Sequence, residues 1–208
     1  MKNCAVKSSA LVLLVLMFAL VAPINEEGQF GLSPVYAAEE KSEKKQKTRR
    51  VPSLSESVYK KLGEGQEAID AKDYNLAQEI IQGALDRSRR YNENEIANLH
   101  NMLGYIYYLK DDYNGAIREY KIVVNQGEKI PEGLEVTTLY TLAQLSYVQE
   151  NYDDALYYME VWITKATNPS SAPRFFLATV YYQMKDYDKA VEQMELGVQI
   201  AQERNTTI

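Results

Sequence analysis

The sequence KDYNLA, at Lys72–Ala77, recurs as DDYNGA at Asp111–Ala116, ENYDDA at Glu150–Ala155 and KDYDKA at Lys185–Ala190. The alanines that end these four cassettes are 39, 39 and 35 residues apart. A period of this length is typical of stacked helical repeats, in which each helix pair buries its apolar face only against its neighbours. The cassettes therefore predict an all-α array of about four helix-turn-helix units, which is eight helices. Such an array favours binding of other proteins over catalysis.

The second repeat shows how a cassette is embedded in helical periodicity. Leu103, Gly104 and Tyr107 precede the cassette, Ala116 ends it, and Tyr120 follows. Spacings of three and four residues place each apolar set on one face of its helix. The small residues at 104 and 116 predict that the two helices of the pair cross closely.

This succession of Leu, Gly or Ala, Tyr, Ala and an aromatic residue resembles the tetratricopeptide repeat family. The resemblance covers Val58–Arg204, and only the first of the four copies is degenerate. It implies a right-handed α-solenoid that binds protein partners. The implied array spans 55–204, with repeats near 58–91, 97–130, 136–169 and 171–204 and a short tail over 205–208.

The N-terminal 37 residues have the pattern of a signal peptide. Lys2 and Lys7 precede an uncharged apolar run of thirteen residues from Ala10 to Ala22, which is short for a membrane span. Small residues at Val35 and Ala37 predict cleavage after residue 37. The alternative is an uncleaved segment that anchors the chain in the inner membrane. In both cases we expect the repeats on the far side of that membrane.

Residues 38–54 are predicted to form a basic, disordered linker. Residues 38–50 carry six Lys/Arg and three Glu, without apolar residues beyond alanine, so they cannot bury enough surface to fold. The alternative is an electrostatic contact with anionic lipid or cell-wall polymer. Residues 1–37 carry two lysines and two glutamates and are neutral overall, and residues 38–50 carry +3. Because the whole chain has a net charge of −6, residues 51–208 have a net charge of −9. An acidic array argues against nucleic acid as a partner.

The sequence contains no catalytic or metal-binding constellation, which predicts a non-enzymatic protein without cofactor or metal. His100 is the only histidine, and the only cysteine, Cys4, lies in the predicted signal peptide. No second ligand of either type remains to share a metal ion. Acidic pairs such as Asp111-Asp112 adjoin the predicted corners, where carboxylates favour helix N-termini.

The predicted binding surface is the concave groove lined by the first helix of each pair. Tyr108, Tyr147 and Tyr182 share one helical position and would form a ladder along this groove. Tyrosine supplies apolar contact area together with a hydroxyl group and is enriched at interface hot spots. The alternative is that some of these rings only pack between repeats. The full predicted set is Asn101, Tyr105, Tyr108, Tyr140, Gln144, Tyr147, Phe175, Thr179 and Tyr182.

Two segments, Ser55–Ala77 and Ile130–Val148, resemble the secreted repeat proteins that accompany TonB–ExbB–ExbD systems of γ-proteobacteria. The resemblance implies a periplasmic accessory role in TonB-driven uptake, with TonB, ExbB or ExbD as partners. The alternative is a scaffold in outer-membrane assembly or in cell-wall synthesis and division. No polar capping helix follows the fourth repeat in the sequence, which predicts that a homodimer contact or a docked partner covers it.

Overall fold

The computed structural model describes residues 49–167 and 169–205, all of which belong to one compact unit, Lys47–Ile208. The predicted signal peptide (1–37), most of the predicted linker and residues 206–208 of the predicted tail lie outside the described residues. None of the helices in the described ranges is long and apolar enough to cross a membrane.

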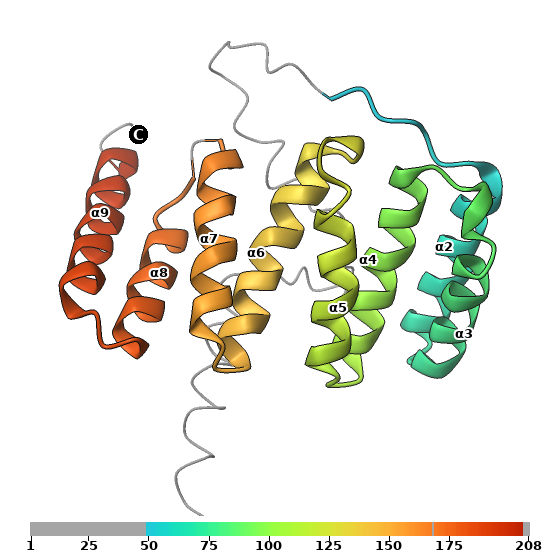
Figure 1. The fold of residues 1–208 in the computed structure, drawn as a ribbon, viewed down its shortest axis with the longest axis horizontal. Coiled ribbons are helices and arrows are strands. Elements are labelled where there is room, and N and C mark those ends of the chain that lie inside the picture. The colour runs from blue at the N-terminus through green and yellow to red at the C-terminus, as the bar shows by residue number, and fades with distance from the viewer. Residues whose placement is uncertain (1–48, 168, 206–208) are drawn as a thin grey trace, which may run out of the picture. The chain divides into compact units, whose positions relative to one another are not determined.

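Eight α-helices form four antiparallel pairs within the described residues, and the pairs stand side by side in chain order (Figure 1). This confirms the predicted all-α solenoid of about four units. Short 3-10 turns, Ser88–Arg90 and Gly127–Lys129, follow the first and second pairs. The pairs are α2 (Glu56–Asp70) with α3 (Tyr74–Leu85), α4 (Glu93–Leu109) with α5 (Tyr113–Val124), α6 (Glu132–Val148) with α7 (Tyr152–Lys165), and α8 (Ala172–Gln183) with α9 (Tyr187–Asn205).

The first cassette forms the tight corner between α2 and α3. Lys72 has a left-handed backbone, with φ of 60°, and its N–H donates to the carbonyl of Ile69 at 2.8 Å. The N–H of Asp73 donates to the carbonyl of Ala68 at 2.9 Å, which completes the pair of bonds typical of a Schellman helix end. The Asp73 carboxylate then accepts from the N–H of Leu76 at 3.0 Å and caps the next helix.

The other three cassettes build the same corner. Asp111, Glu150 and Lys185 have φ between 58° and 63°, and the residue after each caps the second helix with its side chain. One residue that ends a helix is thus followed directly by one that begins the next. This requirement explains why the cassette carries a polar residue, then Asp or Asn, then the first helical tyrosine. The capping residues are Asp112, Asn151 and Asp186.

The helices of a pair cross closely, as the small residues predict. Ala116 is fully buried, and a Cβ atom on Gly104 would lie 2.8 Å from the ring of Tyr120. One buried cluster runs from Ala116 through α6 and α7 to Leu177, and a second joins α2, α3 and α4. Most stability therefore comes from apolar contact between neighbouring pairs, as expected for helices too short to be stable alone.

Residues 49–55, which we call the strap, lead into α2 along the edge where the first turns of α4 and α6 lie (Figure 1). The side-chain amide of Asn94 donates to the carbonyl of Pro52 at 2.8 Å, and that of Asn92 donates to the carbonyl of Ser53 at 3.2 Å. These two bonds fix the strap to the beginning of α4.

Two buried carboxylates hold the ends of the strap. Glu95, in the first turn of α4, accepts from the N–H of Ser55 at 2.7 Å. Glu135, in the first turn of α6, pairs with the Arg49 guanidinium and, at 3.0 Å, with Lys165 of α7. The prediction of a disordered linker over 38–54 rests on apolar burial alone, whereas residues 49–53 have polar partners that lie far away in sequence.

Candidate functional site

The three predicted ladder tyrosines occupy equivalent places at the end of the first helix of repeats two, three and four. Each ladder tyrosine contacts the tyrosine that begins the second helix of its own repeat, so the corner fixes its position. The ring centroids of these pairs are 5.6 to 6.0 Å apart. The pairs are Tyr108 with Tyr113, Tyr147 with Tyr152, and Tyr182 with Tyr187.

Tyr140 and Tyr147 also contact the next repeat. Both lie on α6, and the ring of Phe176 from α8 packs against them at 6.0 and 5.6 Å. Tyr140 further contacts Trp162 of its own second helix at 5.5 Å. The Tyr147 hydroxyl accepts from the Gln183 amide at 3.4 Å. These two tyrosines are half-buried and therefore pack between repeats, in addition to facing the predicted groove.

Repeat two brings Tyr105 and Tyr108 together in a stacked pair with centroids 6.4 Å apart. Burial raises the pKa of both phenols above the ordinary value, so both remain neutral hydrogen-bonding groups at neutral pH. Asn101 and Gln144, one helical turn away on α4 and α6, are half-buried. Repeats two and three therefore each contribute a mixed aromatic and amide surface from their first helices.

In repeat four, the phenylalanine that contacts the tyrosines of α6 is Phe176, whereas the sequence prediction placed Phe175 in the groove. The Phe175 ring occupies the space above Gly197 of α9, where a Cβ atom would lie 2.4 Å from it. Thr179 donates its hydroxyl to the Phe175 carbonyl at 2.9 Å, within α8. Only Tyr182 of the predicted set is mainly exposed, at 60%.

Sequence reasoning missed the role of Phe176 as the ring between Tyr140 and Tyr147. Adjacent residues on a helix point about 100° apart, so Phe175 and Phe176 cannot serve the same surface. The signal was the double phenylalanine itself, because two adjacent rings on one helix serve two different sides of it.

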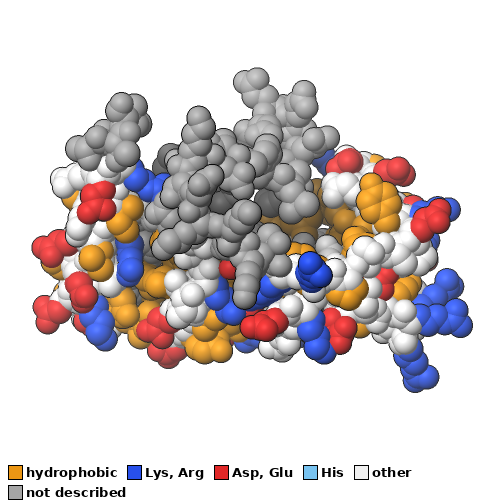
Figure 2. Space-filling view, turned by 90° about the horizontal axis from the view of Figure 1, so that it is seen from above, with side chains coloured by type: hydrophobic (Ala, Val, Ile, Leu, Met, Phe, Trp, Pro, Cys, Tyr) orange, Lys and Arg blue, Asp and Glu red, His pale blue; other side chains and the backbone are white. Residues whose placement is uncertain are grey.

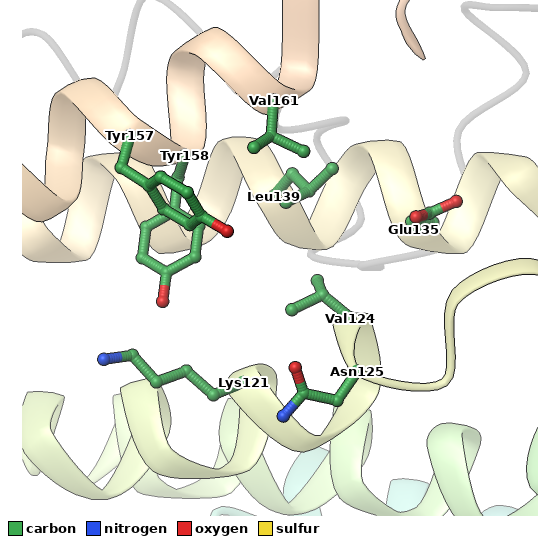
Figure 3. A pocket seen from close by; sticks show the side chains of 8 residues that line it. All are labelled: Lys121, Val124, Asn125, Glu135, Leu139, Tyr157, Tyr158 and Val161. Atoms are coloured by element: carbon green, nitrogen blue, oxygen red, sulfur yellow. The ribbon is translucent and has the colours of Figure 1, made fainter. Parts of the chain in front are cut away.

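A cavity of about 200 Å³ opens on the opposite, second-helix face, between α5 and α7 above α6 (Figure 3). Its apolar part comes from Val124, Leu139 and Val161, and Tyr158 points from α7 toward Lys121 on α5, with Tyr157 beside it. The remaining lining residues are Asn125 and Glu135.

The charges around this cavity are already paired. Burial is the largest single influence and acts to lower the pKa of Lys121, but Asp154, which it bonds at 3.2 Å, and Tyr158 together outweigh burial and the pKa is raised. Burial acts to raise the pKa of Glu135, but Arg49 and Lys165 outweigh it and the pKa lies below its ordinary value. These shifts stabilise the charged forms of structural ion pairs and do not prepare an acid or base for proton transfer.

Two further polar features stand outside both faces. Three exposed arginines, at 87, 89 and 90, border a shallow cavity of about 390 Å³ with Asp86 on the connector between α3 and α4. His100 of α4 contacts Glu119 of α5 through Nδ1 at 2.6 Å, and both side chains are mostly buried. Within residues 49–167 and 169–205, no group of three His, Cys, Asp or Glu side chains is arranged to hold a metal ion.

Helix pairs joined by four identical capped corners define a tetratricopeptide-type α-solenoid, and similarity to solved structures supports this class. The crystal structure of MamA is similar with a TM-score of 0.59 at 15% identity, over 72% of this chain and 81% of MamA. BtubC (BKLC) from P. vanneervenii is similar with a TM-score of 0.60 at 18% identity, over 71% of this chain and 64% of BtubC. Both are helical repeat proteins of the same type. At these identities the similarity shows the fold alone. No family model and no curated protein sequence matches the chain.

Proposed function

We propose that the protein is a non-enzymatic adaptor that binds a segment of another protein along its first-helix face. The observation that carries the proposal is the recurrence of one aromatic arrangement in three successive repeats, because a periodic row of tyrosines suits an extended or helical partner segment. Tyr108, Tyr147 and Tyr182 each end a first helix and are each held by a corner tyrosine. Held aromatic side chains lose little entropy on binding, which favours affinity.

The absence of catalysis is part of this proposal. The buried carboxylates Glu95 and Glu135 both have a pKa below the ordinary value because each accepts hydrogen bonds that outweigh its burial. A catalytic acid needs the opposite shift, toward neutral pH. These carboxylates therefore serve as structural anchors.

The partner that we propose is a component of a TonB-type energy-transduction system in the periplasm. Support comes from the resemblance of Ser55–Ala77 and Ile130–Val148 to the repeat proteins that accompany TonB, ExbB and ExbD. The alternative, a scaffold in outer-membrane assembly or cell-wall synthesis and division, would use the same face with different partners.

Site-specific photocrosslinking in intact cells tests the proposal. A photoreactive residue at Tyr182 should yield adducts with TonB, ExbB or ExbD, identified by mass spectrometry. The matched control is Tyr157 on the second-helix face, whose 58% exposure is close to the 60% of Tyr182. Equal adducts from both positions would contradict a first-helix binding face. Adducts with outer-membrane assembly or murein enzymes would select the alternative partner class.

The location of the protein is tested separately by N-terminal sequencing of the mature chain. A start at Ala38 is expected for a cleaved signal peptide, whereas a start at Met1 would support the uncleaved membrane anchor. The predicted homodimer through the fourth repeat stays a prediction, which a measurement of molecular mass in solution tests.

A further inference from the structure

The outer face of α9 carries an apolar stripe that lies open to solvent. Tyr187, Val191, Met194 and Val198 are each between 43% and 58% exposed. Their spacings of four, three and four residues place them on one side of the helix. The neighbouring side, with Ala190 and Gly197, is buried against α8. Four exposed large apolar side chains on one helix side form an interaction patch rather than the scattered exposure of an ordinary surface.

The same positions in the preceding repeats are covered by a helix. The stripe residues correspond to Tyr152, Leu156, Met159 and Ile163 of α7, 35 residues earlier. Met159 is fully buried, and Leu156 and Ile163 pack with it in the cluster that includes Leu177 of α8. In α5 the corresponding Tyr113, Ile117, Tyr120 and Val124 pack in the same cluster, together with residues of α6. In both junctions this side of a second helix receives the first helix of the next pair, so the α9 stripe has the composition of a helix-accepting surface.

The charges beside the stripe restrict which helix can occupy it. Asp188, Glu192 and Glu195 are exposed on the side of the stripe that points away from α8. Figure 2 shows, at the end of the array where α9 lies (left in Figures 1 and 2), hydrophobic side chains together with acidic and some basic ones. A helix docked on the stripe therefore needs basic side chains along one edge.

A second copy of the chain does not offer a helix with a basic edge, either when its α2 docks on the stripe or when two α9 stripes pack together. Its α2, placed as the next first helix, would bring two carboxylates, Glu67 and Asp70, to the contact against one cation, Lys60, and all three are exposed on the free side of α2. Two α9 stripes packed antiparallel about a twofold axis would place their acidic edges on the same side, where they repel.

We propose that the outer face of α9 binds an amphipathic helix of a different protein, with apolar residues at i, i+4, i+7 and i+11 and Lys or Arg along one edge. The helix lies where the first helix of a following pair would lie. This surface is separate from the first-helix groove, so the inference stands or falls independently of the proposed adaptor function.

A pair of synthetic peptides tests the proposal. Both peptides are about 18 residues long, long enough to form helix on docking. Both have leucine at i, i+4, i+7 and i+11, and the other positions are alanine with lysine in one peptide and with glutamate in the other. Fluorescence anisotropy with the purified protein should give a dissociation constant at least about tenfold lower for the lysine peptide, and 0.5 M salt should reduce this difference.

Two matched variants locate the binding surface. V191K/M194K should abolish binding of the lysine peptide, while circular dichroism and the melting temperature stay unchanged because both side chains are exposed. The control Y59K places the same charge on α2, where Tyr59 is 73% exposed, and should leave binding unchanged.

Three results would overturn the proposal. The first is equal binding of both peptides, the second is binding that V191K/M194K leaves intact, and the third is no binding of either peptide. A dimer in analytical ultracentrifugation that V191K/M194K dissociates would assign the stripe to a second copy instead.

Discussion

The two end helices of the array, α2 and α9, face solvent in different ways. The free side of α2 carries Lys60, Gly63, Glu67 and Asp70, all exposed, with Tyr59 as the one large apolar residue beside them. The free side of α9 carries the four-residue apolar stripe. A solenoid end that faces water needs a polar surface. The difference therefore indicates that the free side of α2 is suited to face water, whereas the free side of α9 resembles the surface of a helix inside the array.

The largest expected effect comes from shortening the same side chain inside the array and at its end. Met159→Ala should lower the free energy of unfolding by about 2–5 kcal/mol, because the side chain is fully buried between repeats. Met194→Ala, at the corresponding position of α9, should lower it by less than about 1 kcal/mol. Urea unfolding followed by circular dichroism measures both. Similar losses would show that the free side of α9 is packed like that of α7, which would contradict its exposure to solvent.

The strap distinguishes the α2 end further, and Glu135→Ala should release its beginning. The variant leaves Arg49 and Lys165 without their shared carboxylate, and because both cations are partly exposed we expect a loss of about 1–3 kcal/mol. Limited proteolysis at Arg49 and Arg50 should become faster. Glu64→Ala, a surface ion-pair partner on α2, serves as the control and should leave cleavage unchanged. An unchanged cleavage rate in Glu135→Ala would contradict the anchoring role.

Acidification should weaken the strap end before the α9 end. The pKa of Glu135 is lowered in the folded state, so its contribution to stability is complete above the ordinary carboxyl value of about 4.3. That contribution is lost as the pH falls from there toward the lowered pKa. Hydrogen exchange of the Glu135 amide, which donates to the Pro131 carbonyl at the start of α6, and of the α9 amides between pH 6 and pH 3.5 measures it, after correction for intrinsic rates. In Arg49→Ala the loss should be smaller, since one cation that lowers the pKa is gone.

The smallest effect is expected at the corners, which are alike at both ends. Lys72→Gly and Lys185→Gly remove a left-handed non-glycine residue but give the unfolded chain more freedom. The two effects oppose each other, so the unfolding free energy should change by less than about 1 kcal/mol at either corner. Thermal unfolding of the two variants compares them. A large difference between them would show that the corners carry unequal strain.

The sequence predicts the parts of this molecule that depend on local chemistry. The cassettes specify corner, cap and helix start within six residues, and for that reason the four helix pairs could be predicted. The packing of Phe176 between Tyr140 and Tyr147 was not predicted, because the choice between adjacent phenylalanines depends on how two repeats are rotated relative to each other. The strap was missed because its partners, such as Glu135, lie far along the chain. The binding role of the predicted groove residues stays a prediction.

The ion pair between Arg49 and Glu135 joins residues 86 positions apart, whereas the main helix–helix contacts join helices of the same or of adjacent pairs. Closing a loop of that length costs entropy before the contact is gained, whereas adjacent helix pairs form with short loops. We therefore expect the repeats to fold first and the strap to dock last, once α6 is in place. The time at which the strap amides become protected during refolding then reports when the third repeat has formed.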